Sequence, residues 1–228
     1  MNIKDFFLGK YDHEFWKNRL TPLIIIEFLG TLMIAWALRP MWLDDSWYYI
    51  PFANYISGLG KGRMEGNIGA WFFMIGFMVY PIMGTAWNSY LSRKFFEVSK
   101  VYGVLIWIVF EFSLWNVALV GIFDGSWPEP GLSGYLHWFG ATYSFMGHTI
   151  SATLILVGVS IVYWMANSED RNINHPFKFA LILVELVGVY LIFRAFGGTF
   201  WQWMIMLSIV IFAFSTTRLF PETLKLGK

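Results

Sequence analysis

Long apolar stretches alternate with short polar segments along most of this chain, the pattern of helices that cross a membrane. Six of the stretches come near the roughly 20 residues that one crossing needs. We predict spans at Leu20–Leu38, Asn67–Tyr90, Val101–Phe123, Leu136–Met165, Phe177–Phe193 and Phe200–Thr217. The expected fold is therefore all-α, a single transmembrane bundle of six helices within residues 1–228.

The fourth predicted span carries a polar stripe. His137, Ala141, Ser144, His148 and Ser151 recur at i, i+4, i+7, i+11 and i+14, so they share one helix face. Large apolar and aromatic side chains occupy the other faces. A helix of this kind is expected to bury its polar face against other helices inside the membrane.

The connecting segments differ in character. Residues 1–19 lack the compact apolar core and small-residue cleavage site of a signal peptide. They are expected to form a cytoplasmic tail or an amphipathic helix on the membrane surface, with Phe6, Phe7, Tyr11 and Phe15 roughly at helical spacing.

The connection at 39–66 holds too many aromatic residues for a disordered linker. We expect it to pack as a lid on the bundle or to lie at the level of the lipid headgroups. A tight turn is predicted at Gly197-Gly198, between the last two spans.

Basic residues near the span ends predict the orientation, because cytoplasmic connections are enriched in Lys and Arg. They concentrate in the N-terminal tail, in the second and fourth connections and in the C-terminal tail. These residues are Lys4, Lys10, Lys17, Arg19, Arg93, Lys94, Lys100, Arg171, Lys178, Arg218, Lys225 and Lys228. We therefore expect both termini in the cytoplasm and the protein in the cell membrane.

Composition agrees with a membrane protein and narrows the chemistry. Hydrophobic residues make up 57% and charged residues 14%, whereas soluble domains average about 45–50% and about 25%. A net charge of +1 gives no field for nucleic acid, and the lack of cysteine excludes disulfides and thiolate ligands. His137 and His148 lie about 16 Å apart along one helix, too far to share a metal or haem iron. We predict no metal and no cofactor.

Ionisable residues within the predicted spans are candidate functional groups, because charge at membrane depth is costly. Glu111, His148 and Glu185 lie near the middle of their spans, and Glu27 lies in the cytoplasmic half of the first. They could form an acid–base cluster for a proton relay or a polar ligand. The favoured interpretation is interhelical hydrogen bonds, each worth roughly 1 kcal/mol.

A second polar group is expected on the non-cytoplasmic side. Arg39 and Arg194 could bind a lipid phosphate, and His137 with Asp124 could act as an acid–base pair. The remaining candidates of this outward-facing site are Ser57, Asn54 and Glu129. The structural alternative is that these residues are snorkelling side chains and helix caps.

Short motifs resemble a known family of six-helix membrane proteins. They are Tyr55-Ile56-Ser57-Gly58-Leu59-Gly60, Ala70-Trp71-Phe72, Val120-Gly121-Ile122-Phe123 and Leu136-His137. The chain resembles the damage-regulated autophagy modulator (DRAM) family, with the related lipid-remodelling proteins and prokaryotic relatives. Gly58 stands where that family often has an acidic residue. The resemblance implies lipid handling or membrane organisation.

Three functions are therefore expected, in different classes. The first is a lipid-binding or lipid-remodelling protein with an outward-facing polar pocket, whether or not it is an enzyme. The second is a non-catalytic subunit or scaffold of a larger membrane complex. The third is a proton-coupled carrier that uses Glu111, His148 and Glu185.

Overall fold

The computed structural model describes residues 2–40, 49–123, 131–166 and 176–224. Helices account for nearly all regular structure in these residues. They are α1 (Ile3–Phe7), α2 (His13–Phe15), the π-helical η1 (Trp16–Leu20), α3 (Thr21–Ala37), the 3-10 helix η3 (Ile56–Gly60), α4 (Ile68–Phe96), α5 (Lys100–Ile122), α6 (Leu132–Met165), α7 (Pro176–Phe196) and α8 (Thr199–Leu219).

Six helices are long and apolar enough to cross a membrane, which confirms the prediction of an all-α, multi-pass protein. The first of them runs without a break through α2, η1 and α3, from His13 to Ala37, and so begins earlier than the predicted Leu20. Asp12 is the reason, because its carboxylate accepts the Phe15 N–H at 2.7 Å and caps the helix at this point.

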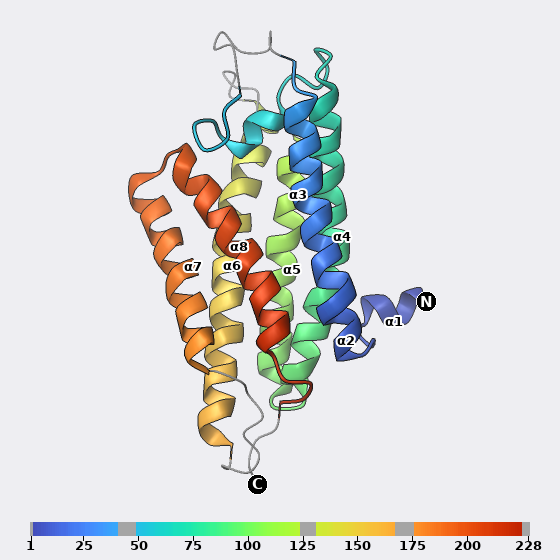
Figure 1. Cartoon of the computed structure of the whole chain (residues 1–228), viewed down its shortest axis with the longest axis vertical. Coiled ribbons are helices and arrows are strands. Elements are labelled where there is room, and N and C mark those ends of the chain that lie inside the picture. The colour runs from blue at the N-terminus through green and yellow to red at the C-terminus, as the bar shows by residue number, and fades with distance from the viewer. Residues whose placement is uncertain (1, 41–48, 124–130, 167–175, 225–228) are drawn as a thin grey trace.

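Neighbouring helices in the chain are neighbours in space (Figure 1). The helices α3, α4, α5 and α6 form the body of the bundle, and α7 and α8 pair beside α6 and α3. We call the two ends of the bundle the η3 end and the α1 end. Figure 1 shows η3 at the top and α1 projecting sideways from the lower half of the bundle, with α6 extending further down.

Glycines let the long helices approach closely. A Cβ at Gly147 would lie 2.6 Å from the Cβ of Ser113, so α5 and α6 meet there almost backbone to backbone. Along the same helix, His148 and Ser151 are buried. The polar stripe on α6 is therefore packed against other helices, as predicted.

The predicted turn between the last two spans is present. Only Gly197 and Gly198 separate α7 from α8, with φ values of 62° and 88°. Both values lie in the region that L side chains rarely adopt, which explains the two glycines. The turn makes α7 and α8 an antiparallel hairpin.

Two contacts fasten the chain at the α1 end. The ring of Phe6 stacks on Trp16 with centroids 6.1 Å apart. The buried Lys94 of α4 donates from Nζ to the carbonyl oxygens of Pro221 and Glu222, at 2.8 and 2.7 Å. Lys94 thus ties the segment that follows α8 to the bundle.

The N-terminal segment differs from a single amphipathic helix. It turns at Gly9, whose φ is 63°, and the apolar side chains exposed on α1 and just after it are Ile3, Phe7 and Leu8. By contrast, Phe6 and Phe15 pack against the core.

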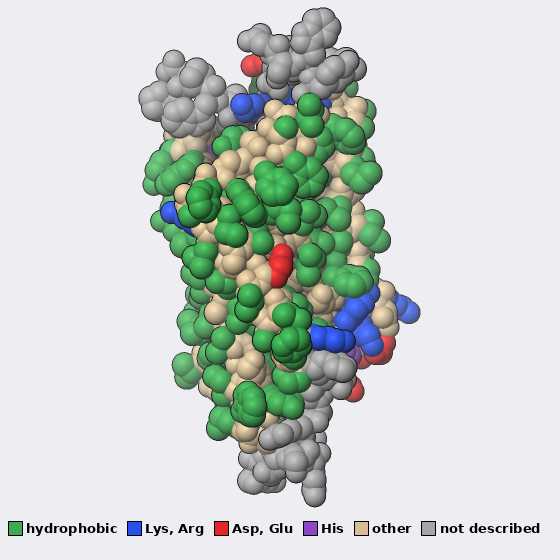
Figure 2. All heavy atoms as spheres, turned by 60° about the vertical axis from the view of Figure 1, so that its left-hand side comes forward, with side chains coloured by type: hydrophobic (Ala, Val, Ile, Leu, Met, Phe, Trp, Pro, Cys, Tyr) green, Lys and Arg blue, Asp and Glu red, His purple; other side chains and the backbone are tan. Residues whose placement is uncertain are grey.

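The sides of the bundle are apolar. Figure 2 shows a face on which hydrophobic side chains cover most of the length, with an acidic side chain near mid-height and basic side chains mainly above and below it. The helix α7 contributes strongly to such surface, since Phe177, Val184 and Leu191 are exposed. This distribution suits helices surrounded by lipid.

Candidate functional site

A narrow cavity of about 70 Å³ lies inside the bundle. Side chains from α3, α4, α5, α6, α8 and η3 form its wall. Its apolar lining consists of Ile24, Ile25, Phe28, Ile56, Phe77, Trp87, Val117, Val120, Ala141, Phe145, Met206, Ile209, Val210 and Ala213. Six polar side chains complete it, namely Thr21, Ser57, Tyr80, Ser144, His148 and Gln202.

Tyr80 and His148 meet in the wall of this cavity. The Nδ1 atom of His148 lies 2.8 Å from the carbonyl oxygen of Ser144 and also contacts the hydroxyl of Ser113. Because a carbonyl oxygen only accepts, Nδ1 carries the hydrogen. The other ring nitrogen, Nε2, then accepts a hydrogen bond from the Tyr80 hydroxyl at 3.0 Å. The pair joins α4 to α6 across the bundle.

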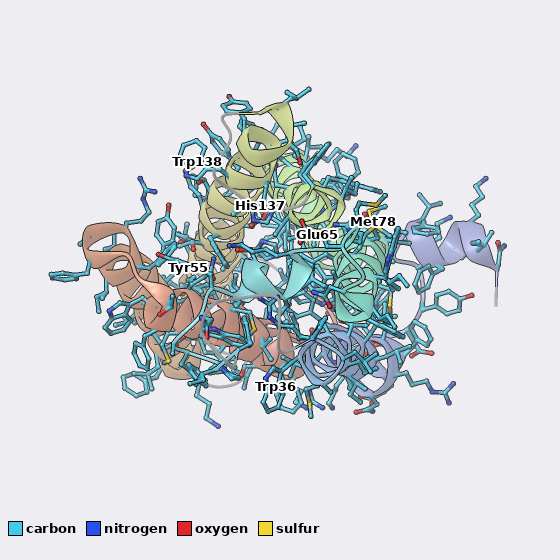
Figure 3. The ribbon with its side chains drawn as sticks, turned by 90° about the horizontal axis from the view of Figure 1, so that it is seen from above. Trp36, Tyr55, Glu65, Met78, His137 and Trp138 are labelled. Atoms are coloured by element: carbon cyan, nitrogen blue, oxygen red, sulfur yellow. The ribbon has the colours of Figure 1, made fainter. Side chains whose placement is uncertain are left out.

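The η3 end of the cavity is closed by η3 itself. Figure 3 shows this short helix lying over the middle of the bundle. Gln202 of α8 holds it, since Oε1 accepts the Ile56 N–H at 2.8 Å. Arg39 at the end of α3 also holds it, donating from Nη1 to the Gly58 carbonyl at 2.5 Å. The side chain of Ser57 is thereby placed against the cavity.

The α1 end of the cavity is held by a second group of hydrogen bonds. Thr21 of α3 donates to the hydroxyl of Thr217 on α8 at 3.2 Å. Trp87 of α4 donates from Nε1 to the same oxygen at 3.0 Å. Three helices are thus tied together where the cavity ends.

The predicted catalytic residues do not form one group among the described residues. His137 is buried, and its Nδ1 lies 2.8 Å from the carbonyl oxygen of Phe123, at the end of α5. Figure 3 shows His137 directed into the bundle and Trp138 away from it. Asp124 and Glu129 lie outside the described residues. Ser57 lines the cavity, whereas His137 lies one turn beyond the lining residue Ala141.

The predicted ligand-binding residues lie apart on different elements. Arg39 lies over the ring of Tyr49, 5.4 Å from its centroid, in addition to its bond to η3. Asn54 accepts the Ile50 N–H through Oδ1 at 2.7 Å, and its carbonyl oxygen accepts from Trp203 Nε1 at 2.9 Å. Both residues therefore shape the connection between the first two spans. Arg194 is exposed in the last turn of α7.

Tyr49 is part of the same connection. Burial raises the pKa of its phenol, against a smaller opposing effect of Arg39. The hydroxyl remains protonated at neutral pH and donates to the Tyr55 carbonyl at 2.8 Å.

The ionisable residues within the spans belong to separate groups. Glu111 of α5 accepts from Thr85 at 2.5 Å and from Asn88 at 3.0 Å, both on α4. Glu185 of α7 accepts from Ser208 of α8 at 2.5 Å. These are interhelical hydrogen bonds, and none among the described residues joins Glu111, His148 and Glu185 to one another.

Glu27 differs from the other ionisable residues in the spans. Both of its carboxylate oxygens are buried and have no hydrogen-bond partner among the described residues.

Tyr80, Gln202 and Trp87 are the main cavity residues that the sequence analysis did not single out. A signal for two of them exists, because Gly76, Tyr80, Gly84 and Trp87 share one face of α4. The glycines of that face lie against Thr31 of α3 and Leu114 of α5, and Tyr80 reaches α6 through its hydrogen bond to His148. Gln202 is the single glutamine of the chain and lies within an aromatic sequence, so its position gave no periodic signal.

Comparisons of the chain with protein-family models, with curated proteins and with solved structures found no match in any of the three.

Proposed function

We propose that this multi-pass membrane protein binds a lipid and that one hydrocarbon chain of the lipid occupies the central cavity. The apolar wall of the cavity carries the proposal. Gln202 and Ala213 both belong to this wall and are eleven residues apart on α8, so the cavity extends about 16 Å along the bundle. An elongated apolar space inside a membrane-spanning bundle matches hydrocarbon in shape and chemistry.

The size of the cavity limits the ligand. Its volume of about 70 Å³ is well below the roughly 300 Å³ from which sites for drug-sized molecules begin. The cavity as it stands is too small for a complete hydrocarbon chain, so binding requires side chains of the wall to move. A single slender chain needs less movement than a ring system or two chains side by side. Met206 in the wall is unbranched and can adjust its rotamer to such a chain.

Binding is better supported than lipid remodelling. A hydrolase or acyltransferase would need a base beside its nucleophile. Ser57 lines the cavity, but no hydrogen bond joins it to a histidine among the described residues. A proton-coupled carrier has less support, because Glu111, His148 and Glu185 belong to separate hydrogen-bonded groups.

The α1 end is proposed to face the cytoplasm and the η3 end the outside, in the cell membrane. The distribution of basic residues supports this orientation, since Lys4, Lys10, Arg19, Arg93 and Lys100 lie in or beside α1, α2 and the α4–α5 connection. The lipid would then reach the cavity from the bilayer that surrounds the bundle.

The test measures lipid that co-purifies with the full chain in nanodiscs, by mass spectrometry of the extract. Ala213→Phe fills the α1 end of the cavity and should remove most of the bound lipid. Ala195→Phe adds the same ring at an exposed position of α7 and should change nothing. Equal lipid content in the wild type and Ala213→Phe would refute the proposal.

A further inference from the structure

Charge is absent from the cavity wall among the described residues. Its lining contains no Asp, Glu, Lys or Arg side chain. A phosphate, carboxylate or ammonium group inside it would lose its hydration without gaining a partner. The free-energy cost of this desolvation is far larger than the gain from burying a hydrocarbon chain. Whatever part of a ligand enters this cavity is therefore uncharged.

Most polar groups of the wall are already satisfied. Thr21 donates to Thr217, and Ser144 donates to the Ala141 carbonyl at 3.1 Å. Tyr80 and His148 bond to each other, and Nδ1 of the histidine is used on the Ser144 carbonyl. None of these four residues needs a ligand to complete its hydrogen bonding.

Gln202 and Ser57 are the exceptions. Gln202 is only 8% exposed, and its Oε1 accepts the Ile56 N–H, so the side-chain amide is oriented with Nε2 as a free donor. The hydroxyl of Ser57, next to Ile56, has no hydrogen-bond partner among the described residues. Both groups lie at the η3 end of the cavity. Neither Gln202 Nε2 nor the Ser57 hydroxyl is a fully buried atom, so a ligand oxygen in the cavity can reach both and form hydrogen bonds with them.

We infer that the ligand is an uncharged, single-chain lipid whose hydroxyl or carbonyl oxygen binds Gln202 and Ser57, with its chain directed toward Ala213. Long-chain alcohols, protonated fatty acids and monoacyl esters belong to this class. The inference rests on the proposed binding of a lipid chain in the cavity. The inference adds the position of the ligand's polar group and the exclusion of ligands whose polar group is charged.

The experiment measures equilibrium binding of tritium-labelled hexadecanol to the full chain in phosphatidylcholine nanodiscs, with empty nanodiscs subtracted. Unlabelled hexadecanol should compete well, and hexadecane and hexadecyltrimethylammonium poorly. Ser57→Ala should weaken hexadecanol binding about tenfold, which corresponds to about 1.4 kcal/mol. Ser160→Ala removes a hydroxyl that bonds to Leu156 on α6, outside the cavity, and should leave binding unchanged.

A substitution at Gln202 should strengthen the binding of a second ligand, a result that misfolding cannot produce. Gln202→Glu keeps an acceptor for the Ile56 N–H but replaces the donor with an oxygen. It should weaken hexadecanol binding about tenfold and strengthen binding of hexadecylamine. Loss of both ligands would contradict the inference, as would an unchanged preference for the alcohol.

The outcomes separate the two proposals. If the alcohol, the alkane and the quaternary amine bind equally well and Ala213→Phe abolishes binding of all three, a lipid chain occupies the cavity, but Gln202 and Ser57 do not bind its polar group. If no chain binds above the empty nanodisc, the proposed function itself fails.

Discussion

Tyr80 and His148 come from helices α4 and α6 and meet inside the bundle, with 3.0 Å between Oη and Nε2. The Ser144 carbonyl sets the hydrogen of His148 on Nδ1 and so makes Nε2 an acceptor for the Tyr80 hydroxyl. Removing the phenolic oxygen leaves that acceptor buried in apolar surroundings.

Tyr80→Phe should therefore destabilise the protein by about 1–3 kcal/mol, the cost of an unsatisfied buried group. In a chain of this size, each kcal/mol corresponds to about 2–4 °C in Tm. Thermal unfolding in detergent, followed by tryptophan fluorescence, measures the change. Tyr135→Phe is the matched control, since Tyr135 is 57% exposed. Equal Tm values for the two variants would contradict the pairing of Tyr80 with His148.

Gly147→Ala tests the close approach of α5 and α6. The added methyl group would lie 2.6 Å from the Cβ of Ser113, and overpacking of this kind costs about 1–3 kcal/mol. Gly188→Ala makes the same change in α7, where nothing lies within 4 Å of the added carbon. That variant should be neutral or stabilised by up to about 1 kcal/mol, because alanine is the better helix former. The same thermal measurement compares them, and a Gly188→Ala protein less stable than Gly147→Ala would be the contrary result.

Thr21→Cys combined with Thr217→Cys tests whether α3 and α8 are adjacent at the α1 end. The two hydroxyl oxygens are 3.2 Å apart, so cysteines at these positions face each other at a distance that a disulfide can bridge. The natural chain has no cysteine, so mild oxidation followed by unfolding in dodecyl sulfate should leave no thiol for a maleimide–polyethylene glycol reagent. The pair Thr21→Cys and Val184→Cys places the second thiol on the exposed face of α7. Both thiols of this control should react with the reagent. Thiols that react in the Thr21→Cys/Thr217→Cys protein, or that fail to react in the control, would show that α3 and α8 are not adjacent at this end.

The proposed orientation predicts opposite labelling of the two ends in cells. Glu65 is exposed at the η3 end and Lys100 is exposed at the start of α5. A membrane-impermeant maleimide should label Glu65→Cys in intact cells and Lys100→Cys only after permeabilisation. Labelling in the reverse order would invert the bundle. An inverted bundle would contain the same cavity, because the cavity lies within the membrane-spanning helices.

Local signals explain which parts of this fold could be predicted from the sequence. Ser99 caps α5 by accepting the Tyr102 N–H at 3.3 Å, and the two glycines at 197 and 198 form the α7–α8 turn. Both features are encoded within a few residues. Lys17 and Arg19 predict a polar tail up to residue 19, but the helix that contains the first span begins earlier, at His13. The cap at Asp12 starts a helix that continues through them.

The candidate site was harder to predict, because its groups meet through contacts between distant parts of the chain. Similar depth along the spans does not show whether Glu111, His148 and Glu185 contact one another. Their partners depend on which helix faces which, and Glu111 faces Thr85 and Asn88 instead. Gln202 was missed for the same reason, since its partner is the backbone N–H of Ile56, 146 residues away.

The attachment of Lys94 to the segment after α8 bears on how the protein is made. Pro221 and Glu222 leave the ribosome only after all six spans have been synthesised, so the Lys94 ammonium group acquires its carbonyl acceptors last. A product truncated before residue 221 lacks both acceptors and so loses two hydrogen bonds from a charged group, each worth about 1.5–3 kcal/mol. Such an incomplete chain is expected to be less stable than the full chain, and destabilised chains are removed by cellular proteases.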